Sequence, residues 1–421
     1  MNRITLFRGT RPLCFTALAL GLAWALRGHF GHEQGAAWAG AVGSLALILI
    51  SGRPDWQRKA LPASLLGGIG WGVGGMMSYG LVVGYGRSGD FANVLYGLSM
   101  LAVIGGLYGF IGGGFLGLSL ETEKDKKPDW PALLTQMVAG GLLVWGVLIY
   151  QWELWMTPPR SELWAACLGA AAGLAWYLQR NRFRRTLRIA LWSALGAGFG
   201  FALGNFFQTL GAVSGWSFNW WNVMEFTLGA CGGLGLAYGV YTQEWPESAE
   251  VSSRSGTLAL LGLFIVLPLV NVWQAFSLEE FTQMAAGLNA VNAVQFAHAQ
   301  YYLAVSGVIL FAFAAWYAWR KSSTTSLFFL LTALYILLSH LKKGFFFLND
   351  SLQLEQYVYW LLFFSLVLLY SSSRSKPSPL FAERERAGGV VVTAILVVAL
   401  VLMAFISVVV SAGIAGGQRR F

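Results

Sequence analysis

The stretch Arg180–Gly204, RNRFRRTLRIALWSALGAGFGFALG, contains the two features that decide the fold of this chain. Its first nine residues carry five arginines, and the remainder is uncharged, apolar and rich in glycine. A basic loop that leads into a long apolar segment is typical of the cytoplasmic end of a transmembrane helix. The same alternation of loops and apolar segments recurs along all 421 residues.

The composition also indicates a membrane protein. Apolar residues make up 56% of the chain, charged residues only 11%, and the mean hydropathy is +0.59, whereas a soluble domain has about 25% charged residues. The apolar runs are continuous and do not alternate, which excludes a transmembrane β-barrel. We therefore expect an all-α polytopic membrane protein with 13 spans. The predicted spans are 12–27, 35–51, 60–84, 91–118, 131–150, 162–178, 185–210, 222–242, 257–275, 299–318, 325–340, 356–371 and 389–412.

The basic residues predict the orientation of these spans. Of the 28 Lys and Arg residues, 21 fall in alternate loops. They are Arg3, Arg8, Arg11, Arg53, Arg58, Lys59, Lys124, Lys126, Lys127, Arg180, Arg182, Arg184, Arg185, Arg188, Arg254, Arg320, Lys321, Arg374, Lys376, Arg384 and Arg386. The positive-inside rule places these loops in the cytoplasm, so the N-terminus is inside and the C-terminus outside, in a membrane such as the bacterial inner membrane. The net charge of +9 follows from this pattern and requires no nucleic acid.

An internal repeat divides the first part of the chain. Trp38–Gly43 (WAGAVG) matches Trp164–Gly169 (WAACLG) with an offset of 126. Leu66–Gly75 (LGGIGWGVGG) matches Leu195–Gly204 (LGAGFGFALG), and Asn93-Val matches Asn222-Val, both with an offset of 129. A repeat of four spans gives both copies the same orientation in the membrane, as in parallel-repeat transporters. The predicted units are 1–128, 129–256 and a C-terminal bundle, 257–421.

Glycine and cysteine usage has simple explanations. The 52 glycines are concentrated in four spans at small-xxx-small spacing, which lets helices approach closely in lipid; the alternative is that these helices slide during a transport cycle. Cys14, Cys167 and Cys231 all lie in predicted spans without metal-ligand spacing, so they predict neither a disulfide nor a metal.

Polar residues gather near the predicted outer ends of the spans and supply the candidate binding residues. Glu225 lies about one turn inside the eighth span, where a carboxylate is costly and is a functional candidate, although an interfacial carboxylate that reaches water is an alternative. Arg27 ends the first span on the same side, so we expect the two to meet. The candidate substrate-binding set is Arg27, His29, His32, Glu33, Asn205, Gln208, Trp220, Trp221, Glu225, Lys342 and Lys343.

Recognisable cofactor and catalytic motifs are missing from the sequence. His29, His32 and Glu33 could ligate a metal, but three neighbouring residues are a weak match and no HExxH motif occurs. The sequence also lacks a GxSxG motif and any recognisable haem or quinone pattern. We expect no metal and no cofactor, and the catalytic residues, if any, are unknown.

Three functions are compatible with these features. The first is a transporter of a small polar or anionic solute, in which Arg27, Lys342 and Lys343 attract the anion and Glu225 or a histidine couples a proton. The second is a membrane enzyme that acts at the outer face on a lipid-linked sugar or acyl substrate, with His29, His32, Glu33 or Glu225 as acid or base. The third is a structural subunit of a membrane assembly. Each implies the lipid bilayer as a partner, and the first two a small-molecule or lipid-linked substrate; the oligomeric state is open.

The predicted orientation can be tested by cysteine labelling. In intact cells, an impermeant thiol reagent added from outside should modify Ser214→Cys and leave Ser253→Cys unmodified, because these serines lie in loops on opposite sides. The unsubstituted chain, whose three cysteines lie in predicted spans, is the control. The reverse labelling pattern would place the polar cluster in the cytoplasm.

Overall fold

The computed structural model describes residues 3–288, 290–343, 347–348, 351–372, 388–411 and 417–421. These residues are almost entirely helical. The helices are α1 (Arg3–Arg27), α2 (Glu33–Ser51), α3 (Pro54–Arg58), α4 (Ala60–Gly75), α5 (Gly80–Tyr85), α6 (Phe91–Glu121), α7 (Trp130–Trp145), α8 (Ser161–Arg180), α9 (Arg184–Ser214), α10 (Trp220–Tyr241), α11 (Ser253–Leu261), α12 (Leu267–Ala275), α13 (Leu278–Gly287), α14 (Ala293–Arg320), α15 (Thr324–Lys343), α16 (Leu354–Ser371) and α17 (Gly389–Val410). Two π-helical segments, η1 (Gly146–Gln151) and η2 (Gly262–Val266), extend α7 and join α11 to α12. A short antiparallel pair, β1 (Phe347–Leu348) and β2 (Ser351–Leu352), precedes α16.

Ten of the described helices are long and apolar enough to cross a membrane, when α7 and η1 are taken as one helix and α11, η2 and α12 as another. The helical membrane class is therefore supported, and every predicted interval contains helix, although α1, α4 and α8 are not among the ten. The basic residues Arg374, Lys376, Arg384 and Arg386 lie outside the described residues.

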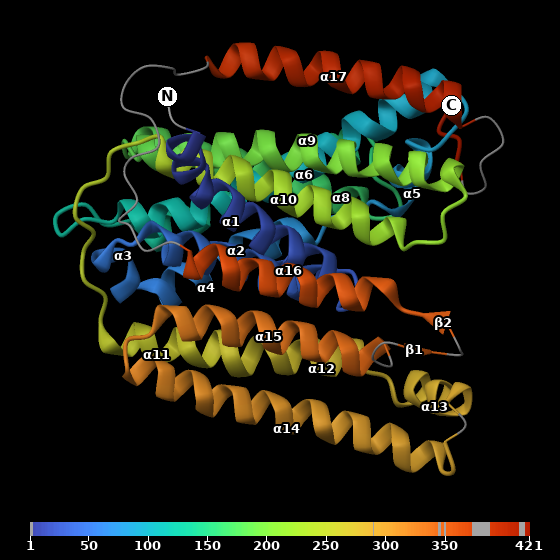
Figure 1. Cartoon of the computed structure of the whole chain (residues 1–421). Coiled ribbons are helices and arrows are strands. Elements are labelled where there is room, and N and C mark those ends of the chain that lie inside the picture. The colour runs from blue at the N-terminus through green and yellow to red at the C-terminus, as the bar shows by residue number, and fades with distance from the viewer. Residues whose placement is uncertain (1–2, 289, 344–346, 349–350, 373–387, 412–416) are drawn as a thin grey trace.

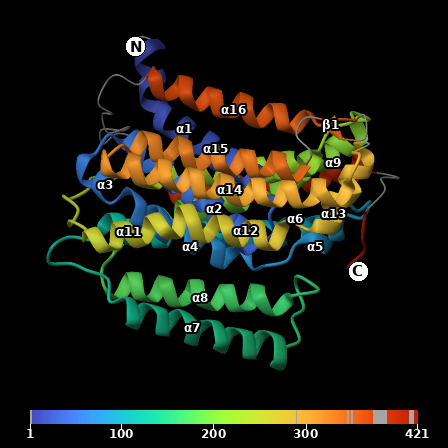
Figure 2. The same ribbon diagram turned by 90° about the horizontal axis from the view of Figure 1, so that it is seen from below.

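A closed ring of helices forms the centre of the molecule. α1 packs on α2, α2 on α4, α4 on α6, α6 on α9, α9 on α10, and α10 again on α1. The remaining helices surround this ring: α11, α12, α15 and α16 pack against α1, α2 and α4, and α14 lies outside them (Figure 1). The helix α17 crosses α6 and α9 on another side, and the α7–α8 hairpin forms a separate layer (Figure 2).

Trp71 of α4 fills the inside of the ring. Its side chain is fully buried and packs edge-to-face on Trp24 of α1, with ring centroids 5.0 Å apart. Three ring helices meet the indole with glycine: a Cβ added at Gly40 or Gly112 would lie 2.5 or 2.4 Å from Trp71, and one at Gly232 would lie 3.1 Å away. Glycine is therefore required at Gly40 and Gly112 because any larger side chain would overlap the indole.

The predicted span 60–84 is interrupted, which corrects the expectation of one continuous helix. α4 ends at Gly75, and Tyr79 has φ −148° and ψ 0°, outside the helical region. α4 ends on the pair Gly74–Gly75, and glycine is a poor helix former. Gly74 and Gly75 also approach the backbones of α6 and of the α2 N-terminus closely, so the chain turns there and places Tyr79 at the end of the ring.

The basic loops are joined to one another at one end of the helices, which is called the basic end below. The Arg53 guanidinium donates to the Pro246 carbonyl at 2.7 Å and the Arg185 side chain to the Glu244 carbonyl at 2.7 Å. The Lys126 ammonium donates to the Arg182 carbonyl at 3.0 Å. The first two bonds attach the linker between α10 and α11 to the loop before α3 and to the start of α9, at the left of Figure 1. The third joins the α6–α7 loop to the α8–α9 loop. The opposite end, which contains Arg27 and Glu225, is called the polar end.

The two predicted repeat units pack differently around the ring. In the first, α2 lies in the ring beside α4, whereas its counterpart α8 lies outside the ring and pairs mainly with α7. Gly140 and Gly169 form the close contact of that hairpin, since a Cβ on either would come within 2.5 Å of the backbone of the other helix. The sequence repeat stays a prediction, and the ring itself is assembled from both units.

The role of Trp71 predicts a stability difference between two glycine substitutions. Gly112→Ala should lower the free energy of unfolding by about 1–3 kcal/mol, the usual cost of overpacking, because the new methyl group would overlap the indole. Gly307→Ala in α14, where a Cβ would meet nothing within 4 Å, is the matched control and should be neutral or stabilising.

The measurement is the thermal unfolding midpoint of the purified protein in detergent. Adding Trp71→Phe to Gly112→Ala should recover part of the loss, since the smaller ring leaves room for the methyl group. Equal midpoints for the two single alanine variants would contradict a close-packed ring interior.

Candidate functional site

A buried ion pair closes the polar end of the ring. Arg27, the last residue of α1, donates through Nη1 to Glu225 Oε1 at 3.1 Å and to Oε2 at 3.3 Å. The side chain of Arg27 is 2% exposed and that of Glu225 is 0% exposed. Two charges without water are costly unless each is matched and hydrogen-bonded, so the pair ties α1 to α10 in this conformation.

Tyr79, from the break between α4 and α5, completes the coordination of both charges. Its hydroxyl donates to Glu225 Oε1 at 2.6 Å and accepts a hydrogen bond from Arg27 Nη1. A discontinuous helix that brings polar groups together is a recurrent feature of transporter binding sites. The break in the helix therefore has a direct consequence for the site: it brings α4 to the ion pair between α1 and α10.

His32 and two aromatic rings surround the Arg27 guanidinium. Arg27 Nη2 donates to His32 Nδ1 at 3.0 Å, which requires the neutral ring because arginine can only donate. Burial, and next the Arg27 charge, lower the pKa of His32 to about 4, so His32 is neutral near pH 7. The Arg27 guanidinium carbon lies 5.6 Å from the Trp24 ring centroid and 5.2 Å from that of Tyr79, within the range of cation–π attraction.

An aromatic column continues from this cluster into the ring. Tyr79 contacts Phe201, Phe201 contacts Tyr108, and Tyr108 contacts Trp24, with centroid separations of 4.9, 6.2 and 5.4 Å. Three buried donors here have no acceptor: Arg27 Nε and the indole N–H groups of Trp24 and Trp71. Buried donors normally find a partner, so these three N–H groups are exceptions within a closely packed interior.

The sequence-predicted residues divide between this cluster and other places. The structure brings Arg27, His32 and Glu225 together, and Trp221 packs on Tyr79 with ring centroids 6.2 Å apart. His29 points elsewhere: its Nδ1 lies 2.6 Å from Ser339 Oγ of α15, and its ring contacts Tyr359 of α16. Burial, then Lys343, Lys342 and His340, lower the pKa of His29 to about 3.

Five other predicted residues have partners outside the cluster. Glu33 is half-exposed and pairs with Arg160 at 3.9 Å. Lys342 donates to the Ala275 carbonyl and lies 3.6 Å from Glu280. Asn205 bonds to Gln208 and to the carbonyl of Val83 in α5, each at 3.3 Å. Trp220 donates to the Trp216 carbonyl at 3.1 Å and covers Gly211. Lys343 is the last residue of α15.

Sequence reasoning missed Tyr79, Trp24 and Trp71. Trp24 and Trp71 lie within apolar spans and look like ordinary packing residues, so only the ring reveals their unpaired N–H groups. For Tyr79, the sequence contains a pattern from which its place in the site could have been predicted. The segment Met76-Met77-Ser78-Tyr79-Gly80 follows two glycines inside a predicted span, and glycine-interrupted spans point to binding sites in transporters.

Comparison with known proteins identifies no relative: no protein family, curated protein or solved structure matches the chain.

The buried pair predicts strong coupling between Arg27 and Glu225. Arg27→Gln or Glu225→Gln alone leaves one buried charge uncompensated, and each should destabilise the protein by about 3–5 kcal/mol. The double variant removes both charges and should be more stable than the sum of the two losses implies.

The measurement is a double-mutant cycle on thermal unfolding in detergent. Glu33→Gln, which removes a half-exposed carboxylate that pairs at 3.9 Å, is the matched control and should change stability by less than about 1 kcal/mol. Additive losses from Arg27→Gln and Glu225→Gln would contradict a direct buried pair.

Proposed function

We propose that the protein is an integral membrane transporter of a small polar or anionic solute, and that the helical ring is its pathway. The observation that carries this proposal is the buried Arg27–Glu225 pair, which joins two ring helices directly above an interior with unpaired donors. A static structural role would not require a charged pair in the ring, because apolar residues of similar volume usually stabilise at least as well.

The chemistry of the pair suggests how the solute binds. The Arg27 guanidinium presents a planar set of donors that matches a carboxylate or phosphate, and Glu225 occupies the position of such an anion in the closed state. An incoming anion would replace Glu225 on Arg27, and a proton taken up by Glu225 would remove the charge left behind. Proton and anion would then move together, with Tyr79 able to donate to either group.

The proposed proton carrier is Glu225 and not His32. A histidine coupled to transport has to change protonation between about pH 5 and pH 8, whereas the pKa of His32 is lowered to about 4. Protonation of His32 would also place a second cation beside Arg27, since their nitrogens are 3.0 Å apart. His32 is therefore proposed to hold the guanidinium as a neutral acceptor.

Trp71 is the proposed barrier inside the ring. Its indole is enclosed by the helix that carries it and by four of the other five ring helices, α1, α2, α6 and α10, three of which face it with glycine. Glycine-lined contacts let helices shift along one another with little steric resistance. A movement of α4, which is already interrupted at its polar end, would displace Trp71 and open the pathway.

The membrane arrangement is part of the same proposal. The chain would cross the membrane 13 times, with the basic end in the cytoplasm and the polar end and the C-terminus outside. The first four-helix repeat unit would contribute four helices of the ring and the second unit two. The bacterial inner membrane fits the strong positive bias of one set of loops.

An enzyme is the second candidate, and one contact favours it. His29 Nδ1 lies 2.6 Å from Ser339 Oγ, within the distance needed for a histidine to activate a hydroxyl. However, Ser339 is fully buried and His29 is 7% exposed, so a lipid-linked substrate would reach the hydroxyl only after the helices separate. A role as an assembly subunit has no particular contact in its favour.

The transport proposal predicts a specific phenotype for Glu225→Gln. Proteoliposomes containing the protein should accumulate one of three labelled probes, succinate, glycine or inorganic phosphate, when an inward proton gradient is applied. In Glu225→Gln, probe binding should survive while uptake no longer responds to the gradient, because the amide cannot carry a proton.

Glu279→Gln, which replaces an exposed carboxylate in α13, is the matched control and should transport normally. Ser339→Ala should also transport normally. If the protein were instead an enzyme that uses the Ser339 hydroxyl, this substitution would abolish its catalytic activity. Gradient-dependent uptake by Glu225→Gln at the rate of the unsubstituted protein would remove Glu225 from the mechanism.

A further inference from the structure

We propose that the basic end carries a binding site for one anionic phospholipid, between α11 and α14. The site combines a polar cavity at the ends of these helices with an apolar groove that continues along them, and Trp316 lines both. It lies far from the Arg27–Glu225 cluster and does not depend on the proposed transport function.

The polar cavity has the chemistry to hold a phosphate headgroup. It has a volume of about 690 Å³ and is lined by Arg58, Arg320, Trp316, Trp319 and the first turn of α11, including Ser252 and Ser253. The first N–H groups of a helix favour an anion. No carboxylate is among the described residues that line this cavity; Glu250 lines an adjoining recess of about 480 Å³.

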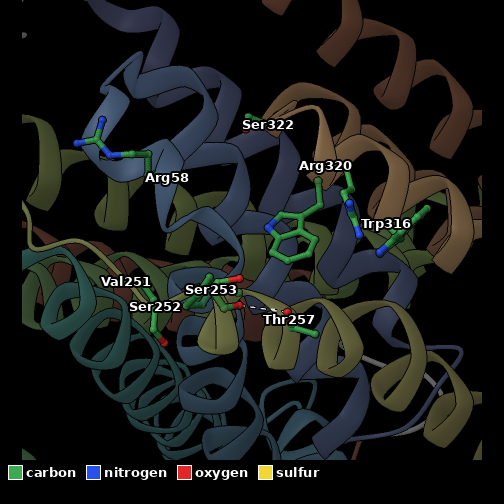
Figure 3. A pocket seen from close by; sticks show the side chains of 11 residues that line it. Arg58, Val251, Ser252, Ser253, Thr257, Trp316, Arg320 and Ser322 are labelled. Atoms are coloured by element: carbon green, nitrogen blue, oxygen red, sulfur yellow. Dashed lines mark hydrogen bonds between the residues drawn. The ribbon is translucent and has the colours of Figure 1, made fainter.

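Figure 3 shows how the labelled side chains are arranged. Arg320 and Trp316 of α14 form one wall, and Ser252, Ser253 and Thr257 of α11 form the opposite one. The Arg320 guanidinium carbon lies 4.8 Å from the Trp316 ring centroid. The Arg58 guanidinium points away from these groups in Figure 3. It pairs with Glu247 at 3.8 Å, and both side chains are exposed. Because an exposed ion pair contributes little stability, Arg58 can release Glu247 and bind a phosphate instead.

The groove has the chemistry to hold an acyl chain. It has a volume of about 360 Å³ and is lined on one side by Leu260, Leu261, Phe264 and Ile265 and on the other by Val308, Ile309, Ala312 and Phe313. From Trp316 to Val308 the helix rises about 12 Å, so the groove runs away from the polar cavity along the helix axis. Phe313 and Ile309 are 67% and 51% exposed, as expected for residues that face lipid chains.

The junction of the two parts is what indicates a phospholipid. A cation-lined cavity alone would suit free phosphate, and an apolar groove alone would suit any lipid or a neighbouring helix. Tryptophan at the boundary between them is typical of the membrane interface, and basic pockets between membrane helices hold anionic headgroups. Only an amphiphile with an anionic head satisfies the cavity and the groove together.

The test is native mass spectrometry of the full-length protein released from nanodiscs that contain equal amounts of phosphatidylglycerol and phosphatidylcholine. The unsubstituted protein should retain one phosphatidylglycerol preferentially. Arg320→Gln should reduce that preference by about fivefold, the effect of one basic residue near an anionic headgroup, while Arg320→Lys should keep most of it. Arg180→Gln, the matched change at the end of α8, should leave the preference unaltered.

A second variant tests the groove without altering charge. Ala312→Trp fills the groove and should abolish retention of phosphatidylglycerol even though both arginines remain. Persistence of the preference in Ala312→Trp, or displacement of the lipid by an excess of inorganic phosphate, would show that the cavity binds an anion and not a lipid. An equal loss in Arg180→Gln would show general charge attraction, and either result would overturn the proposal.

Discussion

The ring of helices depends on the fit between one indole and three glycines. Trp71 can occupy the interior only because Gly40, Gly112 and Gly232 leave space for it, and the same missing side chains let the helix backbones come close. In a bilayer, helix association relies on such close packing because lipid chains are as apolar as the side chains they replace. The position of the ion pair follows from this packing, since α1 and α10 are neighbours in the ring.

The polar cluster depends on the relative positions of three helices. Arg27 and Glu225 come from different helices, and Tyr79 comes from an interruption in a third. Because each charged group is buried, a displacement that breaks one contact leaves a buried charge with fewer partners, which is costly. Such a cluster resists small movements and responds to a change of charge, which is the property expected of a site controlled by protonation or by an anion.

The two ends of the molecule use their charges differently. At the polar end, arginine and glutamate are withdrawn from water and neutralise each other. At the basic end, positive side chains are mostly exposed or bonded to backbone carbonyls of neighbouring loops. The exposed basic side chains of this end can meet lipid headgroups, and the cavity beside Trp316 is the place where two of them adjoin an apolar groove.

The sequence by itself determined the class of the protein. Its long apolar runs indicate membrane helices, and the charge of Glu225 inside such a run marked it as a candidate because burial of a carboxylate is costly. Only the tertiary structure decided the partners. Arg27 and Glu225 are 198 residues apart, His29 turned to Ser339 although it lies three residues from His32, and Tyr79 entered the site through a helix break. Apolar periodicity has no information on which helices become neighbours, because every lipid-facing and every buried surface is similarly apolar, and so the ring and its contents depend on steric fit between side chains far apart in the chain.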